Sequence, residues 1–500
     1  MEKQNSVLII GKNYFLLLLS LLLSVLLHAQ DQKPVNTKIN IKPLCPNQIH
    51  TESYFGPCKP YSVKEPASIE EQREAFENRC NDFLETVKKN ICPEAEILSP
   101  VSIECQPAAT EKFQVEQSQW EKLEKDIDKT DLILFSGYMR AYGISKYKKP
   151  VALIGQVGSV DIAAYLRSKG QEGYALYDWN ELNDLISLLK VRKAVQQTKL
   201  LYITDRPGGK PTHGVKSVIP AEILEEKYGV DFKYVSFAEL QDEWDRVTND
   251  NELQDKAKQI VRKLSQNAKA VHLEKDYIIN DVNFYLTVKE LMNKYDCNSF
   301  TIDCFEVCPT KITHNKKFVP CLTHSLLKDE GCPSVCEGDL NAFLAMSVEM
   351  YLAKKSVYMG NPVFNKEENI VTIHHAVPGL KMKGLNNPDI TYELQHFTEP
   401  GWGTVIQYDF SQDKGEKVTL ARFNPAGTRL VVSCGTIVGG GPRSEYACAT
   451  TTVEIELPDA AEFYKEQANT GHHLSLVYGD YTEQLKQLGE IMGFETTCIE

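Results

Sequence analysis

Short apolar runs alternate with amphipathic segments between residues 131 and 303 of this chain. The apolar runs have the length of buried strands, and the segments between them have the period of helices. Alternation of this kind favours parallel sheets, because two parallel strands need a crossover connection that is usually a helix. We therefore predict an α/β fold with two Rossmann-like domains. The predicted strands are 131–135, 151–154, 199–204, 270–273 and 299–303, and the predicted helices are 69–90, 160–168, 220–228, 251–264 and 283–295.

The pattern changes near residue 365, where β-branched runs separated by turns replace the strand–helix alternation. This pattern predicts a β-rich C-terminal domain that closes with a helix over 482–492. The expected strands are 369–374, 403–409, 416–423, 429–437, 450–456 and 473–477. The predicted organisation is a leader at 1–30, an N-terminal α/β domain at 31–195, a central α/β domain at 196–360 and the β-rich domain at 361–500. Residues 31–60 are expected to form an irregular lead-in.

The first 30 residues have the layout of a secretory signal peptide. Lys3 and Lys12 precede the apolar run at 14–27, which gives way to the polar sequence His28-Ala29-Gln30. The run is short for a bilayer span, although the apolar residues 7–10 lengthen it. An uncleaved membrane anchor is therefore kept as the alternative to a cleaved signal peptide. We expect an exported protein, periplasmic or secreted, that has no membrane contact after cleavage. The formal net charge of −13 argues against nucleic acid as a partner.

The 14 cysteines fall into two main groups. In an oxidising compartment cysteines tend to pair, so disulfides are expected in the amino-terminal group of Cys45, Cys58, Cys80, Cys92 and Cys105. The second group surrounds several carboxylates and consists of Cys304, Cys308, Cys321, Cys332 and Cys336. Its two C-x-x-x-C pairs are open to three interpretations: buried thiols, local disulfides or a structural zinc site.

Carboxylates at three positions are candidate metal ligands. Glu306 follows a predicted strand, where open α/β sheets bind their ligands. Glu337 and Asp339 precede a long apolar helix, whose dipole favours negative charge at its first turn. The alternative is that these acids are ordinary helix caps or solvated loop residues.

Two histidine pairs and one arginine complete the set of candidates. Because neighbouring side chains of a strand point to opposite faces, at most one imidazole of His472 and His473 is expected to face a site. His374 and His375 repeat this arrangement at the end of another predicted strand. Arg443 follows a glycine triplet that is either a plain hairpin connection or a turn beside a ligand. The triplet lacks the features of a nucleotide-binding loop.

The block Cys336-Glu337-Gly338-Asp339-Leu340-Asn341-Ala342, with the upstream Cys304-Phe305-Glu306 and the late Gly471-His472-His473, resembles the L-fucose isomerase and L-arabinose isomerase superfamily. It is most similar to the shorter fucose-isomerase-like members. The resemblance implies a Mn²⁺ ion, or another divalent metal, held by Glu306, Asp339 and His472, with His473 as the alternative to His472. It also implies that Glu306 and Asp339 move the proton during catalysis and that the protein forms trimers or hexamers. Candidate substrate contacts are His374, His375, Arg443, His473 and Glu337.

The function expected from this resemblance is a metal-dependent isomerase that interconverts an aldose and its ketose through an enediol. The substrate would be a free monosaccharide related to fucose or arabinose. The first alternative is an exported carbohydrate-binding protein that uses the same fold without turnover. The second is a disulfide-stabilised structural protein that binds no small ligand.

Overall fold

The computed structural model describes residues 33–51, 53, 65–105, 115–137, 142–155, 158–207, 220–397, 402–440, 448 and 450–500. The predicted signal peptide, Cys58 and Arg443 lie outside these residues. The chain divides into two compact units, one formed by Lys38–Lys190 and the other by Met1–Thr37 with Val191–Glu500. The predicted α/β class, with parallel sheets and a β-rich C-terminal region, is confirmed. The domain boundaries at 195 and 360 stay predictions.

The unit Lys38–Lys190 is built on a parallel sheet of six strands. The sheet runs in the order β2-β1-β4-β5-β6, and β3 also pairs with β1. Its core joins Leu44, Ile133 and Leu153 of the sheet to Trp120 and Leu166 of the helices. The strands are β1 (Ile39–Gln48), β2 (Ala95–Ile97), β3 (Val101–Cys105), β4 (Leu132–Phe135), β5 (Val151–Ile154) and β6 (Gly173–Leu176). The helices are α2 (Ile69–Asn90), α3 (Gln117–Glu124), α4 (Ser159–Ser168) and α5 (Trp179–Gln196), whose last residues belong to the other unit.

Strand β1 corrects the prediction of an irregular lead-in at 31–60. The strand contains Pro43 and Pro46, which are unusual in a central strand because proline cannot donate to a ladder. On one side, β1 pairs with β2 as far as Ile41 and with β3 from Leu44 onward. Pro43 lies between these two paired segments. Pro46 lies beyond Leu44, the last residue of β1 that pairs with β4. Both prolines therefore occupy positions where a donor is dispensable.

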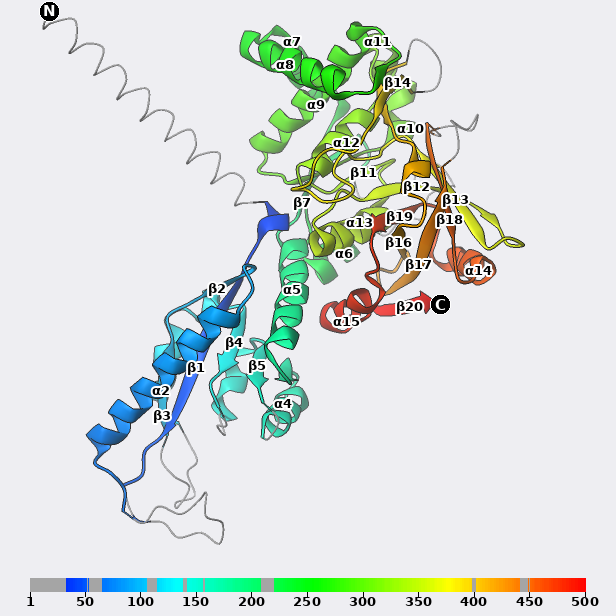
Figure 1. The fold of residues 1–500 in the computed structure, drawn as a ribbon. Coiled ribbons are helices and arrows are strands. Elements are labelled where there is room, and N and C mark those ends of the chain that lie inside the picture. Colours follow the sequence, from blue (N-terminus) through cyan, green and yellow to red (C-terminus); the bar gives the residue numbers. More distant parts are fainter. Residues whose placement is uncertain are drawn as a thin grey trace, which may run out of the picture. The chain divides into compact units, whose positions relative to one another are not determined.

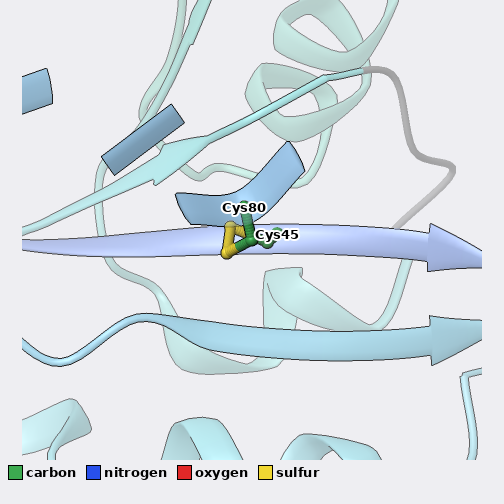
Figure 2. The surroundings of a disulfide bond; sticks show 2 residues. All are labelled: Cys45 and Cys80. Atoms are coloured by element: carbon green, nitrogen blue, oxygen red, sulfur yellow. A yellow bond between two sulfur atoms is a disulfide. The ribbon is translucent and has the colours of Figure 1, made fainter. Parts of the chain in front are cut away.

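A disulfide joins β1 to α2 in this unit. Cys45 of the strand bonds to Cys80 of the helix, and both residues are buried (Figure 2). Phe76 and the partly buried Phe83 pack around them in a small apolar cluster. The expectation of amino-terminal disulfides is confirmed for this pair, whereas Cys92 is a half-buried free thiol.

The larger unit contains a second parallel sheet, in the order β11-β10-β7-β8. Three of its strands, β7, β10 and β11, are almost entirely buried, as expected of a parallel sheet that helices cover, whereas the edge strand β8 is partly exposed. The strands are β7 (Lys199–Ile203), β8 (Asp231–Val235), β10 (Ser299–Ile302) and β11 (Ser334–Cys336). The helices of this region are α6 (Ala221–Tyr228), α7 (Phe237–Asn249), α8 (Asn251–Asn267), α9 (Lys275–Lys294), α10 (Cys304–Val307), α11 (Ile312–Lys316), α12 (Cys321–Asp329) and α13 (Leu340–Ala353).

The C-terminal region forms a mainly antiparallel sheet of seven strands, in the order β16-β19-β12-β13-β18-β17-β20. Because β16 pairs with both β17 and β19, the sheet closes on itself as a barrel. Helix α13 packs against β16 and β19 and also against β11, so it lies between the barrel and the parallel sheet (Figure 1). The barrel strands are β12 (Tyr358–Asn365), β13 (Ile370–His375), β16 (Lys417–Phe423), β17 (Arg429–Gly439), β18 (Thr451–Glu456), β19 (Leu474–Tyr478) and β20 (Glu495–Ile499).

A small sheet in the order β15-β14-β9 and two further helices complete the larger unit. These elements are β9 (Ala270–Val271), β14 (Glu393–His396), β15 (Thr404–Gln407), α14 (Ala460–Thr470) and α15 (Thr482–Met492). Among the described residues, we find no helix that combines the length and the apolar character required to cross a membrane.

Candidate metal centre

The predicted carboxylates lie at one edge of the parallel sheet in the larger unit. Strands β7, β10 and β11 run in the same direction, so their carboxyl ends meet at this edge. Thr204 follows β7, Glu306 lies in the short helix after β10, and Glu337 follows β11 directly. This is the edge at which open α/β sheets bind ligands.

The turn after β11 has an unusual backbone. Glu337 and Gly338 both have positive φ values, of 64° and 62°. A left-handed conformation is costly for a residue with a side chain, and such strain is concentrated at functional sites. Gly338 is required here for a second reason, because a Cβ atom would overlap with the hydroxyl oxygen of Tyr202. The turn buries Glu337, which is 5% exposed.

Asp339 is the N-cap residue of helix α13, and three other residues contact its carboxylate. Its carboxylate accepts a hydrogen bond from the backbone N–H of Ala342, as an N-cap does. Arg422 of β16 donates to both carboxylate oxygens, at 3.0 and 3.2 Å. His473 Nδ1 lies 2.8 Å from Oδ2. Burial acts to raise the pKa of Asp339, but the Arg422 charge and the His473 hydrogen bond outweigh it, so the pKa is lowered.

Glu337, His375 and His473 bring three ligand atoms together. His375 Nε2 lies 3.5 Å from one oxygen of Glu337, and His473 Nε2 lies 3.7 Å from the other. The ligand atoms of the three residues lie within 4.8 Å of one another. Donors bound to one ion at about 2.0–2.2 Å have mutual distances of this order.

The two imidazoles present unused nitrogen atoms to this centre. His375 is fully buried and His473 is 2% exposed, yet neither Nε2 atom has a hydrogen-bond partner among the described residues. Buried nitrogen atoms are normally hydrogen-bonded, so an orphaned pair that faces a carboxylate requires an explanation. Burial lowers the pKa of His375, which favours the neutral, metal-binding imidazole. Two imidazoles and one carboxylate therefore fit a divalent transition metal with open coordination positions.

Glu306 lies at the same sheet edge but makes other contacts. Its carboxylate accepts hydrogen bonds from Thr204 Oγ1 at 2.6 Å and from the backbone N–H of Asp205 at 3.0 Å. Burial raises the pKa of Tyr202, and the charges of Glu306 and Asp339 both add to the effect. The two acids therefore lie around the same tyrosine.

The set predicted from the sequence, Glu306, Asp339 and His472, is not among the ligand groups that the described residues bring together. The side chain of His472 is exposed, yet its ring is partly desolvated, which lowers its pKa to about 4. His374 is buried, and desolvation lowers its pKa too. The assignment of metal to the predicted set stays a prediction.

His324 of α12 is a buried histidine that was not among the candidates from the sequence. It is fully buried, its Nδ1 lies 2.8 Å from Ser334 Oγ, and its Nε2 has no hydrogen-bond partner among the described residues. Burial lowers its pKa, and the charges of Lys328, His375 and Glu337 also act on it. Nothing in the sequence distinguishes it from a core histidine, because only the fold places α12 beside β11.

Comparison with known proteins relates the chain to sugar isomerases. No family model matches it. It is 32% identical over 184 residues to a sulfoquinovose isomerase of Priestia megaterium, a match that covers 35% of this chain and 39% of the relative. Proteins of the same name from Alkalicoccus urumqiensis and Clostridium sp. are 28% and 24% identical, over 36% of this chain and 40% of each relative. The matched part thus spans about two fifths of the length of these curated relatives.

Proposed function

We propose that this chain is a metal-dependent sugar isomerase that interconverts an aldose and its ketose. The observation that carries the proposal is the buried group of Glu337, His375 and His473, whose ligand atoms lie within 4.8 Å of one another. The similarity to proteins named sulfoquinovose isomerase supports the same class of reaction. We further propose that the metal is Mn²⁺ and that the protein is exported and forms trimers or hexamers.

Glu337, His375 and His473 would hold the metal. When bound, a divalent ion stabilises the negative charge that develops on the sugar oxygens during enolisation. Asp339 acts as a positioning residue. It accepts from His473 Nδ1 and so directs the lone pair of Nε2 toward Glu337. Arg422 holds Asp339 in turn through both carboxylate oxygens.

Glu306 is the residue that we propose for proton transfer between C1 and C2. Its carboxylate lies at the ligand-binding edge of the sheet, and Thr204 and the Asp205 N–H orient it. Asp339 is poorly suited to the same task, because its pKa is lowered and Arg422, His473 and Ala342 occupy its oxygens. A weakly basic carboxylate with no free oxygen is a poor proton acceptor.

The substrate class follows from the relatives and from the resemblance together. The relatives are named for the sugar sulfoquinovose. We propose a free aldose of pentose to hexose size, and the substrates to test are sulfoquinovose, L-fucose and L-arabinose. Exchange of the C2 proton with deuterated water measures enolisation directly, even where the product equilibrium is unfavourable.

The test uses metal-stripped full-length protein, its thermal midpoint with and without Mn²⁺, and C2 exchange for each sugar. We expect Mn²⁺ to raise the thermal midpoint, because a bound ion stabilises only the folded state. We also expect Mn²⁺ to start C2 exchange, because the ion stabilises the charge that develops during enolisation. Glu337→Gln should lose both effects. Glu306→Gln should keep the rise in midpoint but lose most of the exchange, since its role is in turnover. Glu393→Gln, at a surface ion pair with His272, is the control and should keep both.

Two outcomes would contradict the proposal. If neither Mn²⁺ nor a related divalent ion changes the midpoint, the metal centre is refuted. If sugars bind to the metal-loaded protein but no C2 exchange occurs, the chain is a carbohydrate-binding protein and not an isomerase.

A further inference from the structure

Glu337 belongs to a second group of ligand atoms, which contains thiols. The sulfur atoms of Cys304 and Cys336 and a carboxylate oxygen of Glu337 all lie within 4.8 Å of one another. The two thiols are therefore close neighbours. Neither sulfur is in a disulfide.

The sheet edge fixes the positions of these thiols. Ile302 of β10 pairs in parallel with Cys336, the last residue of β11. Cys304 begins helix α10 just beyond Ile302, so both thiols leave the sheet at the same edge. Two ligands supplied by neighbouring strand ends form a more rigid site than two ligands of one loop.

Further thiols are close enough to complete a coordination shell. Cys321, at the start of α12, is 4% exposed, and its thiol lies near that of Cys336. Burial raises the pKa of the Cys448 thiol, and the neighbouring Cys304 and Glu337 add to this effect, so Cys448 lies near the group. The group therefore offers three neighbouring ligand atoms and two more thiols from which a fourth ligand can come. Structural zinc sites are tetrahedral and use thiolates in this way.

The two cysteines of the ligand group do not belong to the same C-x-x-x-C pair of the sequence. The group takes one cysteine from each pair, Cys304 from the first and Cys336 from the second. Cys308 is exposed and lies near Thr313. Cys332 is buried, and the charges around it come from Lys33, Glu330 and Lys289. The fold therefore does not bring the four cysteines of the two pairs together in one zinc site.

We propose that Cys304, Cys336 and Glu337 form a second cation site, with Cys321 or Cys448 as a further ligand, for a thiophilic divalent ion such as Zn²⁺. The inference goes beyond the proposed isomerase, because the thiols have no part in that reaction. Binding replaces each S–H bond with a sulfur–metal bond and releases the proton to solvent, without any change of oxidation state. Because Glu337 also faces His375 and His473, the ion in this site competes with the other centre for the same carboxylate.

The probe for this site is Cd²⁺, added to full-length protein that has been reduced and stripped of metal. Thiolate ligation to Cd²⁺ produces an ultraviolet charge-transfer band that imidazole and carboxylate ligation do not. We expect the band to appear and to saturate. Cys304→Ser and Cys336→Ser should each remove it or weaken Cd²⁺ binding by at least about tenfold. A far-ultraviolet circular dichroism spectrum checks that each variant folds, and Cys304, the less buried of the two, is the safer substitution.

Two controls separate this site from other thiols and from the histidine centre. Cys297→Ser removes a half-buried thiol before the amino end of β10, far along the strand from the group, and should leave the band unchanged. His375→Ala removes a ligand of the other centre and should also leave the band in place, whatever it does to turnover. Loss of isomerase activity alone therefore cannot be mistaken for loss of the thiol site.

Three results would overturn the proposal. The first is the absence of a charge-transfer band in reduced, folded protein. The second is a band that survives both Cys304→Ser and Cys336→Ser. The third is a Cys304–Cys336 disulfide that forms again in the presence of excess reductant and excludes Cd²⁺, because the pair would then be a disulfide and not a ligand set.

Discussion

The imidazole of His473 and the carboxylate of Asp339 form a buried pair in which Nδ1 lies 2.8 Å from Oδ2. Because the pKa of Asp339 is lowered, its carboxylate is ionised and only accepts hydrogen bonds. The proton of a neutral His473 must therefore be on Nδ1, which leaves the lone pair of Nε2 facing Glu337 at 3.7 Å. Carboxylates orient metal-binding histidines in the same way in many metalloproteins.

Replacement of Asp339 by asparagine should reduce both stability and metal affinity. The variant leaves the fully buried Arg422 without its counter-ion, and breaking a buried ion pair costs about 3–5 kcal/mol. Loss of a residue that orients a metal ligand typically costs 10–100-fold in metal affinity. Urea unfolding and Mn²⁺ titration measure the two effects.

Asp296→Asn is the matched control for this variant. Asp296 pairs with Lys199 at 2.7 Å but is 87% exposed, so its loss should cost less than about 1 kcal/mol. If the two variants unfold at the same urea concentration, Asp339 and Arg422 do not form the pair described above.

The neighbouring histidines 472 and 473 should differ sharply in metal binding. His473→Ala removes a buried ligand atom and should abolish the Mn²⁺-dependent rise in thermal midpoint. His472→Ala removes an exposed side chain whose ring is outside the ligand group and should leave the rise intact. Loss of the rise in His472→Ala alone would instead support the set Glu306, Asp339 and His472.

Much of the larger unit could be predicted from local patterns. The strand before Glu306 was expected at 299–303 and is observed at Ser299–Ile302, because apolar period and length determine a buried strand. The sequence also predicted that at most one imidazole of His472 and His473 faces a site; only His473 is buried, although both residues precede β19.

The partners of the site residues could not be predicted in the same way. Asp339 and Arg422 are 83 positions apart, and only the packing of α13 against β16 brings them together. For the same reason the sequence did not identify Arg422 as a partner of Asp339. Strand β1 was missed because its two prolines contradict local strand propensity, and only the change of partner strands makes them acceptable.

Gly338→Ala should destabilise the turn that carries Glu337. The positive φ of 62° costs a side-chain-bearing residue about 1–2 kcal/mol. The contact with the Tyr202 hydroxyl adds an overpacking cost of about 1–3 kcal/mol. The double variant Gly338→Ala/Tyr202→Phe should recover the second part, as measured by urea unfolding.

Gly493 provides the control for the energetic cost of a positive φ without a steric contact. It also has a positive φ, of 75°, but among the described residues no neighbouring atom lies within 4 Å of the position that a Cβ would take. Gly493→Ala should therefore cost only about 1–2 kcal/mol. If Gly338→Ala is no worse than Gly493→Ala, the close approach of Tyr202 has no energetic consequence.

Removal of the Cys45–Cys80 disulfide should destabilise the unit Lys38–Lys190. The bond closes a loop with a sequence separation of 35, for which chain entropy gives a stabilisation of about 4 kcal/mol. Hydrogen exchange of β1 and β4 peptides in Cys45→Ala/Cys80→Ala should therefore accelerate. Cys92→Ala, which removes a free thiol in the same unit, should not change that exchange. Equal exchange in the wild type and the double variant would contradict the expectation.

The carboxyl group of Asp281 should make the larger unit less stable as the pH rises. Asp281 is fully buried in α9, where it accepts hydrogen bonds from the backbone N–H groups of Val319 and Thr404, and burial raises its pKa to about 8. In the unfolded chain its pKa is about 3.9. Between these values the folded state holds a proton that the unfolded state has released, so the free energy of unfolding must fall as the pH rises.

The stabilisation by the protonated Asp281 is complete below about pH 4 and is lost by about pH 8. Asp281→Asn cannot titrate, so the difference in urea midpoint between the wild type and this variant should shrink or reverse across that interval. A difference that stays constant from about pH 4 to about pH 8 would show that Asp281 titrates alike in both states.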